Sequence, residues 1–543
     1  MTTASVRPGA DVAVPERTSD PDRLIEALAW VVVAGSCLQV LLFSFGRDQG
    51  IYAVVDDGML HGKMPYRDLW DFKPPGIFLV YALAQALFGK NMLAPRLLEV
   101  AGLVSMVVAY RRLALLGFGS ARIGTLCGAL AVFIHAQLEF WHTGQPETFG
   151  SIVTAWALVL TLSDPPQRRR LLVYGGLGVL WGIAFLFKPP LAGGALVSAA
   201  YLFRRELDGG AAPRRASVPP LVVAAASLCP IALAALWFVA RGAWPALSWT
   251  LFEFTPGYTA LGTEGRSAAR GFYWAFEEAF FKFSALAPAG VLAALLLPTL
   301  HPREREVVLV VLGVIAVQLV GVTMQAKYFQ YHYSPALHLI GFVGGLGVYK
   351  LWRRFHEGGL AGALAWAALV TLLASMREAA KDLPDGFWDR TAVRMRWLAH
   401  REGGRAALDE KLAYVADYNL AADRRVAAAL AQRTTPAAPV FVWGFEPAIY
   451  WLAERRAPTR FIYDVAQRAS WGKERARTEL MLALRSDPPA VVVVQHNDVF
   501  PMVTGDENDS ARALETFPEL DGFLRSGYAR SETIEDFDLY EKR

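Results

Sequence analysis

The chain has 543 residues, of which 54% are hydrophobic and 19% are charged, and its formal net charge is +4. This composition is too apolar for a soluble domain, and the small, dispersed charge argues against a nucleic-acid partner. Charged residues cluster between long apolar runs, such as 24–45 and 283–300, which are long enough to cross a hydrocarbon core of roughly 30 Å. We therefore expect a polytopic α-helical membrane protein in contact with membrane lipids.

Eleven apolar segments are candidates for transmembrane helices. They are 24–45, 94–110, 121–140, 147–163, 171–187, 190–203, 218–240, 283–300, 306–324, 334–350 and 359–375. The segment 76–88 has only 13 residues, which suits a juxtamembrane or re-entrant helix better than a span. We expect about 11 transmembrane helices in a domain of residues 24–375, preceded by a disordered cytoplasmic tail over residues 1–23.

The arginines indicate how these spans are oriented. If 76–88 does not cross, alternate loops carry the arginines of 111–112, 168–170, 204–205, 303–305 and 353–354. By the positive-inside rule these loops are cytoplasmic. The remaining loops then lie outside the cytoplasm, together with the whole tail 376–543. Among them is the long loop 46–93, which we take as the candidate catalytic loop.

The tail 376–543 has the pattern of a small α/β domain. Residues 381–433 predict charged amphipathic helix, 439–444 and 459–463 predict strands, and 447–456 predicts a helix between them. The segment 489–495, with four consecutive valines, is typical of a strand of a parallel sheet that is buried on both faces. The tail contains no Gly-x-Gly-x-x-Gly or P-loop motif that would indicate nucleotide binding.

Charged and aromatic residues are dense in the loop that follows the first span. Asp48 stands where that span emerges, and as a lone acid it could simply be a boundary residue that pairs with Arg47. Tyr66, Arg67 and Lys73 follow in the same loop. Lys73 precedes two prolines that fix an extended backbone, so its ammonium would lie at headgroup depth beside a lipid phosphate. The alternative is a lysine that only snorkels to the interface.

Other outer segments add similar residues to the same face. The Phe-Lys-Pro-Pro run recurs and brings Lys188 there, and two such copies favour phosphate binding over simple snorkelling. Glu147 opens the expected span 147–163. It is either an ordinary acid at a helix N-terminus or a second acidic group facing Asp48. His142 lies in the short loop before Glu147.

The loop 327–335 is both aromatic and basic. An aromatic belt at the membrane interface would explain its tyrosines alone. Lys327 and His332 would also bind an anionic headgroup, and Tyr331 offers a ring on which a sugar can stack.

Taken together, these motifs resemble those of the bacterial C-type (GT-C) glycosyltransferases, which include lipid A aminoarabinose transferases and protein O-mannosyltransferases. The shared elements are Asp48, Tyr-Arg-Asp at 66–68, Phe-Lys-Pro-Pro at 72–75, Arg96, Glu147, Lys188-Pro189 and a Tyr-His-Tyr-x-Pro element at 331–335. The resemblance covers about residues 24–350. It implies a GT-C-like fold in the bacterial cytoplasmic (inner) membrane, with the C-terminal α/β domain extracytoplasmic, as in many bacterial members.

The resemblance also implies an activity. Family members transfer a sugar from a polyprenyl-phosphate donor to a lipid, glycan or protein acceptor. Carried over, the catalytic residues are Asp48 as the base and Glu147 as the second acid, and Lys73 contacts the donor phosphate. The other candidates for substrate binding are Arg67, Tyr66, His142, Lys188, Lys327, Tyr331 and His332.

One departure from the family concerns metal binding. The family often has Asp-Glu at the first motif, where this chain has Asp48-Gln49. If the paired Glu positions an acceptor or a metal, that role passes to Asp56, Asp57 or Glu147. Whether a divalent metal is a cofactor therefore stays open at this point.

Two other classes of protein compete with the transferase. A lipid or sugar flippase or transporter would also have many spans, but it would place ionisable residues near mid-bilayer and often show repeated halves. Here the charge gathers at one face. A scaffold that anchors the α/β tail explains the tail but not the loop. The sequence therefore favours the glycosyltransferase.

Overall fold

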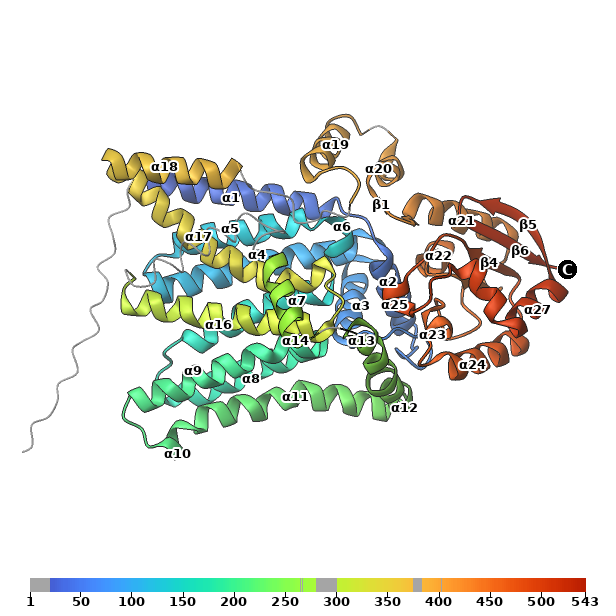
Figure 1. Ribbon diagram of the computed structural model, residues 1–543, viewed down its shortest axis with the longest axis horizontal. Coiled ribbons are helices and arrows are strands. Elements are labelled where there is room, and N and C mark those ends of the chain that lie inside the picture. The colour runs from blue at the N-terminus through green and yellow to red at the C-terminus, as the bar shows by residue number, and fades with distance from the viewer. Residues whose placement is uncertain (1–19, 264, 266, 280–299, 375–382, 402) are drawn as a thin grey trace, which may run out of the picture.

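A bundle of long helices forms one end of the molecule and a smaller mixed domain forms the other (Figure 1). This computed structural model describes residues 20–263, 265, 267–279, 300–374, 383–401 and 403–543. The long helices are α1 (Asp20–Leu41), α4 (Leu93–Phe118), α5 (Ala121–Gln137), α7 (Pro146–Leu162), α8 (Arg170–Phe187), α9 (Gly194–Asp208), α11 (Val218–Ala240), α16 (Pro302–Gln325), α17 (Ser334–Glu357) and α18 (Gly359–Ala374).

Ten of the eleven expected spans coincide with these helices. The eleventh, 283–300, lies outside the described residues except for its last position, as do the tail 1–19 and the expected domain boundary near 375. Within the described part of the chain, five helices are long and apolar enough to cross a membrane, namely α1, α4, α8, α11 and α16. Most of α11 is exposed, as expected for a helix that faces lipid. The protein is a polytopic membrane protein.

The loop 46–93 contains two helices, α2 (Arg47–Leu60) and α3 (Gly76–Phe88). The position expected for Asp48 is corrected here. The first span ends at Leu41, and Asp48 lies in the first turn of a new helix, where a carboxylate is favoured by the helix dipole. Pro75 precedes α3 and Gly89, with φ of +81°, ends it. Both helices lie at the end of the bundle that faces the C-terminal domain (Figure 1).

Short elements connect the long helices. They are α6 (Glu139–His142), η1 (Gln167–Arg169), η2 (Pro189–Gly193), α10 (Pro213–Ala216), α12 (Trp244–Ser248), the π-helical η3 (Trp249–Phe254), α13 (Thr255–Thr263), α14 (Ala268–Glu277) and η6 (Gln330–Tyr333). Of these, α6, α13 and η6 carry residues that are used below.

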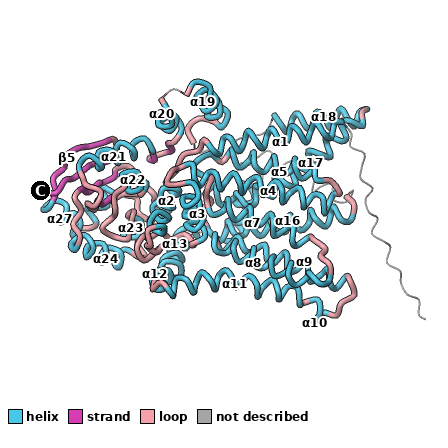
Figure 2. Tube along the Cα trace, turned by 180° about the vertical axis from the view of Figure 1, so that it is seen from behind, coloured by secondary structure: helices cyan, strands magenta, loops and turns pink. Residues whose placement is uncertain are grey.

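The C-terminal domain combines helices with a four-stranded sheet, which Figure 2 shows at the end farthest from the bundle. Its helices are α19 (Phe387–His400), α20 (Gly404–Leu412), α21 (Leu420–Arg433), α22 (Ala448–Ala453), α23 (Val465–Arg468), α24 (Lys473–Ser486), α25 (Pro501–Thr504), α26 (Ser510–Ala513), η7 (Leu514–Thr516) and α27 (Pro518–Gly527). Its strands are β1 (Tyr414–Val415), β2 (Tyr418–Asn419), β3 (Val440–Trp443), β4 (Val491–Gln495), β5 (Tyr528–Ile534) and β6 (Phe537–Lys542).

The sheet has the order β3-β4-β6-β5. The two strands expected at 439–444 and 489–495 are confirmed as β3 and β4; they pair in parallel and are buried on both faces. The antiparallel strands β6 and β5 were not anticipated, because β5 is mostly exposed and polar and lacks the apolar pattern of a core strand.

Two expectations for the tail are wrong. Residues 459–463 form no strand; Phe461 makes only an isolated bridge with Trp70, because this segment packs against the loop between α2 and α3 and not in the sheet. The charged stretch 381–433 is not one continuous helix. In its described part it consists of α19, α20 and α21, with the hairpin β1–β2 between the last two.

The C-terminal domain is packed directly onto α2. Arg47 Nε donates to Glu446 Oε1 at 2.9 Å, and its Nη2 donates to Asp417 Oδ2 at 2.7 Å. Trp70 N donates to Arg460 O at 2.7 Å, which ties the α2–α3 loop to the domain. One hydrophobic core runs from Tyr52 and Trp70 into the domain. The end of the bundle that carries α2 and α3 therefore forms one packed unit with the tail.

Candidate functional site

The start of α2, the loop before α3, the start of α7, the end of α8 and η6 meet at one place. At its centre Lys73 Nζ lies 3.0 Å from Asp48 Oδ1. The Asp48 side chain is 21% exposed and that of Lys73 is 12% exposed, so the pair is shielded but still reachable. Asp48 does not pair with its neighbour Arg47, whose guanidinium turns to the C-terminal domain. Lys73 makes an ion pair, which simple snorkelling would not require.

Lys73 is held from three sides. Its ammonium lies 3.9 Å from Asp71 Oδ2 and over the ring of Tyr52, while Tyr66 donates its hydroxyl to the Lys73 carbonyl at 2.7 Å. Burial alone would lower the pKa of Lys73, but the carboxylates of Asp48 and Asp71 outweigh it and raise that pKa. The lysine is therefore a fixed cation at neutral pH.

Asp71 is fully buried beside Lys73. Tyr463 of the C-terminal domain donates its hydroxyl to Asp71 Oδ1 at 2.6 Å. The other oxygen, Oδ2, has no hydrogen-bond partner among the described residues. Burial raises the pKa of Asp71, against the opposing effect of Lys73.

A second lysine–carboxylate pair lies beside the first. Lys188 Nζ donates to Glu147 Oε1 at 2.6 Å, and Glu147 is fully buried with no hydrogen-bond partner on Oε2. Gln145, two residues before Glu147, links the start of α7 to the Asp48–Lys73 pair, because its Nε2 donates to Asp48 Oδ2 at 3.2 Å. Glu147 is thus both an acid in the first turn of α7 and a neighbour of the Asp48 pair.

Aromatic rings and imidazoles form one wall of the site. His332 Nε2 lies 4.0 Å from Glu147 Oε1, and Lys188 lies over the ring of Tyr331. The ring of His142 lies 6.0 Å from that of Tyr331. Burial lowers the pKa of His332 well below its usual range, and the nearby Lys188 adds to this effect, so the imidazole is neutral at neutral pH.

Two of the expected site residues, Arg67 and Lys327, lie outside the centre of the site. Arg67 is exposed; it pairs with Asp68 and donates to the Arg241 carbonyl at 2.6 Å, so it is not part of this cluster. Lys327 Nζ lies over the ring of Tyr258 and donates to the Met502 carbonyl at 2.7 Å. It borders the site and also ties it to the C-terminal domain.

The position at which this chain departs from the resembling family has a structural role. Gln49 accepts a hydrogen bond from Gly46 N and donates to the Phe140 and Thr143 carbonyls, so it joins α2 to α6. Asp56 accepts from Gln85 and Asp57 from Lys90, away from Asp48. In the described part of the chain, no group of three or more His, Cys, Asp and Glu side chains is arranged to hold a metal ion.

Several residues of the site were not linked to it by the sequence. Gln145 and Asp71 stand next to expected site residues, yet only the fold shows that they contact the Asp48–Lys73 pair. Tyr463 comes from the tail, where no pattern linked it to Asp71. Tyr258 lies 4.8 Å, ring to ring, from Phe72 and comes from α13, a segment without a motif.

A different charged cluster lies nearby, inside the bundle. Arg96 donates to Glu99 Oε2 at 2.7 Å, and the other Glu99 oxygen accepts from Gly144 N at 2.6 Å and lies 2.8 Å from His135 Nε2. Arg96 also donates to the Ser44 carbonyl at 2.9 Å. Both oxygens of this buried carboxylate are occupied by the protein itself.

With this geometry in place, the comparisons with known proteins are informative. Residues 72–237 match the family model described as dolichyl-phosphate-mannose-protein mannosyltransferase. The crystal structure of ArnT from Cupriavidus metallidurans bound to undecaprenyl phosphate is similar, with a TM-score of 0.60 and 14% identity over 95% of this chain and 97% of that one. The chain shares the fold of ArnT.

A second structure agrees with this assignment. ArnT from the same organism in the apo state has a TM-score of 0.56 and 14% identity, over 95% of this chain and 97% of that one. No curated protein sequence matches the chain significantly. The resemblance expected from the motifs is confirmed at the level of the fold.

Proposed function

We propose that this GT-C protein is a membrane glycosyltransferase that moves a sugar from a polyprenyl-phosphate donor to an acceptor hydroxyl. The observation that carries the proposal is the paired arrangement of Asp48 with Lys73 and Glu147 with Lys188 in one shielded site. The similar ArnT structure holds undecaprenyl phosphate, which supports a polyprenyl-phosphate donor. The acceptor class, whether lipid, glycan or protein, is left open in the proposal.

The lysines are suited to bind the donor phosphate. Lys73 is a partly buried cation whose present partner is Asp48. The phosphodiester anion of a donor that enters beside Lys73 would attract the ammonium and release Asp48 from its ion pair. Lys188, at the C-terminal end of α8, would supply a second cation to the same phosphate. Donor binding would thereby leave Asp48 able to accept a proton.

The chemical step is a single displacement at the anomeric carbon. A bond forms from the acceptor oxygen to that carbon, and the bond from the carbon to the phosphate oxygen breaks. Asp48 takes the proton from the acceptor hydroxyl as general base. The electron pair leaves with the polyprenyl phosphate, whose charge Lys73 and Lys188 stabilise. One displacement inverts the configuration at the sugar carbon.

The aromatic wall is suited to the sugar. Tyr331 offers a ring face beside Lys188, and the neighbouring rings of Tyr258 and Phe72 offer further ring faces. Glu147 Oε2 and His332 Nδ1 have no hydrogen-bond partner, and they could bind sugar hydroxyls. A buried polar atom without a partner is costly to leave unsatisfied, which favours its use by a ligand.

We also propose that the site faces outward from a bacterial cytoplasmic membrane. Figure 1 shows α10 and the junction of α17 with α18 at the end of the bundle opposite the C-terminal domain. The arginine pairs 204–205 and 353–354 precede those two points. The positive-inside rule then puts that end in the cytoplasm and α2, α3 and the C-terminal domain outside. A reporter that is active only outside the cytoplasm should work when fused to the C-terminus.

The direct test is a transfer assay on the full chain in lipid nanodiscs. Radiolabelled sugars on polyprenyl phosphate are offered with lipid, glycan and peptide acceptors, and label is followed into each acceptor. We expect label in one acceptor class, and loss of transfer in Asp48→Asn, with the exposed Asp389→Asn as the matched control. Movement of the donor across the bilayer with no transfer to any acceptor would support the flippase alternative and refute the proposal.

A further inference from the structure

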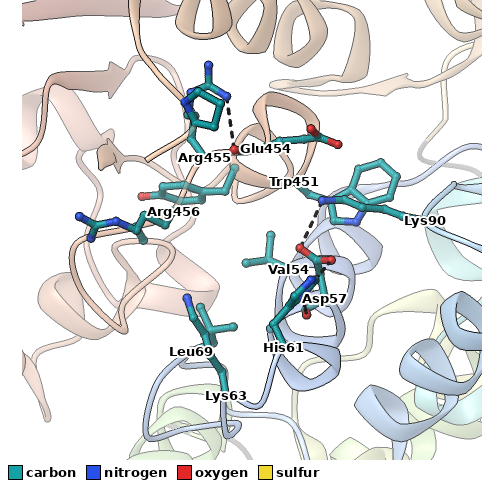
Figure 3. A pocket seen from close by; sticks show the side chains of 14 residues that line it. Val54, Asp57, His61, Lys63, Leu69, Lys90, Trp451, Glu454, Arg455 and Arg456 are labelled. Carbon is teal, nitrogen blue, oxygen red and sulfur yellow. Dashed lines mark hydrogen bonds and ion pairs between the residues drawn. The ribbon is translucent and has the colours of Figure 1, made fainter. Parts of the chain in front are cut away.

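A second cavity lies on the other side of α2 from the candidate catalytic site. It has a volume of about 250 Å³ and is lined from two parts of the chain, as Figure 3 shows. From α2 and its C-terminal end come Val54, Asp57, Gly58 and His61, and from the C-terminal domain come Tyr450, Trp451, Glu454, Arg455 and Arg456; Lys63, Leu69, Lys90, Pro436 and Ala457 complete the lining.

Helix geometry separates the two sites. Val54, Asp57 and His61 recur at the spacing of a single helix face, and Asp57 follows Asp48 by nine positions. At roughly 100° per residue, this places Asp57 on the opposite side of α2 from Asp48. The cavity is therefore not an extension of the Asp48–Lys73 site.

The lining of the cavity carries an excess of positive charge. Four side chains are cationic and two are carboxylates. Lys90 pairs with Asp57 at 3.2 Å, and Arg456 pairs with Asp487 outside the cavity. Two lining cations and one lining carboxylate, Glu454, are left without an ion pair among the described residues, so these three side chains still carry a net positive charge.

These two cations are Lys63 and Arg455. The ammonium of Lys63 is exposed and makes no hydrogen bond or ion pair in the described part of the chain, although its charge helps to lower the pKa of Asp68. The guanidinium of Arg455 makes five hydrogen bonds through its three nitrogens, all to neutral oxygens, including Thr434 Oγ1 at 2.8 Å and the Ala453 carbonyl at 2.8 Å. Arg455 therefore adds positive charge to the cavity, and Lys63 keeps its donors available to an anion.

The cavity lies next to the C-terminal end of α3, a helix with an exposed apolar side. On α3 the side chains of Leu79, Leu83 and Leu87 follow one another at four-residue spacing, and all three are exposed. An exposed apolar stripe on a short helix at the outer end of a membrane bundle is suited to lie against acyl chains. Lys90, which lines the cavity, comes two residues after the end of this helix and lies over the ring of Trp451.

We infer that this cavity binds the phosphate-bearing headgroup of an anionic lipid whose acyl chains lie along α3. Lys63 contacts the phosphate, Arg455 adds positive charge to the cavity, and Lys90 and the Trp451 ring border the glycerol or sugar part of the headgroup. The ligand has two sources, a bulk anionic phospholipid or the lipid acceptor itself. The second source rests on the proposed function.

Binding is tested first, with no need for catalysis. The full chain in mild detergent is titrated with fluorescent short-chain phosphatidylglycerol and, separately, with phosphatidylcholine. We expect phosphatidylglycerol to bind more tightly. Lys63→Ala should weaken its binding about tenfold, as expected for the loss of one charge-assisted contact, and Lys63→Glu should weaken it further. Lys411→Ala, which removes an exposed lysine of α20, should bind as the unaltered chain does.

Three results would overturn the inference. They are equal binding of the two lipids, Lys63→Ala binding no worse than Lys411→Ala, and Lys63→Glu binding no worse than Lys63→Ala. Because Lys63 is exposed and unpaired, its loss should leave folding intact, which thermal unfolding in detergent checks.

A transfer assay then separates the two sources of the lipid. In nanodiscs made only of phosphatidylcholine, Lys63→Ala should raise the acceptor KM with kcat unchanged if the acceptor occupies the cavity. If a bulk phospholipid occupies it, the acceptor KM is unchanged and adding phosphatidylglycerol raises the unfolding temperature of the unaltered chain more than that of Lys63→Ala. Selective binding without any transfer would refute the proposed function and leave this site standing.

Discussion

Two buried carboxylates in this molecule, Glu99 and Glu147, have opposite relations to their surroundings. Both side chains are fully buried and both pair with a cation. Glu99 has partners on both oxygens, from Arg96, His135 and the backbone of Gly144. Glu147 has Lys188 on one oxygen and no hydrogen-bond partner on the other.

The difference separates structural charge from charge that can serve a ligand. A fully buried carboxylate with both oxygens satisfied by the protein is out of reach of a substrate, and it stabilises the fold. A buried carboxylate with one oxygen unsatisfied among the described residues favours use by a ligand. Asp48 differs from Glu99 in its exposure: its oxygens accept from Lys73 and Gln145, but its side chain is 21% exposed, so a ligand can reach it. The two clusters should therefore fail in different ways when mutated.

The largest effect on activity is expected at Asp48. In Asp48→Asn the proton acceptor is lost while size and most hydrogen bonding remain, so turnover should fall by about 10² to 10⁴. The thermal unfolding temperature should stay close to that of the unaltered chain. A well-folded Asp48→Asn protein with full transfer activity would mean that Asp48 is a structural residue, as Glu99 is, and the base would then be sought at Glu147.

Glu99 should show the converse behaviour. Glu99→Ala leaves Arg96 buried without its counter-ion, which typically costs about 3 to 5 kcal/mol of stability. Thermal unfolding in detergent and the yield of folded protein should fall, and whatever protein folds should keep its kcat. A Glu99→Ala protein with unchanged stability and a lower kcat would show that Glu99 acts in catalysis and is not a structural carboxylate.

Smaller effects on activity are expected from removing Lys73 or Lys188, the cations paired with Asp48 and Glu147. Lys73→Ala should raise the donor KM about tenfold, because a charge-assisted phosphate contact is lost. Lys188→Ala should do the same and should also leave Glu147 without its counter-ion, so its stability should fall more than that of Lys73→Ala, whose partner Asp48 is partly exposed. Equal donor KM values for both variants and the unaltered chain would exclude phosphate binding at these lysines.

The smallest effect is expected at Tyr66. Its hydroxyl donates to the Lys73 carbonyl at 2.7 Å and touches no substrate in the proposed arrangement. Tyr66→Phe removes one hydrogen bond, worth about 1 kcal/mol, and should raise the donor KM roughly fivefold with kcat little changed. A drop in kcat with unchanged KM would assign Tyr66 a role at the reacting atoms instead.

Much of the bundle could be predicted from the sequence because apolar length alone defines membrane helices. The sheet was harder. β3 and β4 were visible as continuous apolar runs, whereas β5 is mostly polar on its exposed face and gave no signal. The segment 459–463 has strand-like residues, but its aromatic side chains are used to contact Trp70.

For the site, sequence patterns identified most of the charged residues and none of their pairings. The two Phe-Lys-Pro-Pro runs drew attention to Lys73 and Lys188, which the structure places close together. Nothing in the sequence indicated that each would meet a different carboxylate, because those contacts join segments far apart in the chain. Arg67 was expected at the site from its neighbours in sequence, but it points to Asp68 and Arg241.

The bond from Tyr463 to Asp71 has a consequence for how the site is assembled. Asp71 lies beside Lys73, yet its hydrogen-bond partner is synthesised 392 residues later. In the proposed orientation the loop 46–93 would leave the membrane early in translation, and its buried acid would lack Tyr463 until the tail had also been exported and folded. A chain interrupted before the tail would therefore lack a finished site, and under the proposed function such incomplete copies would be unable to consume donor lipid.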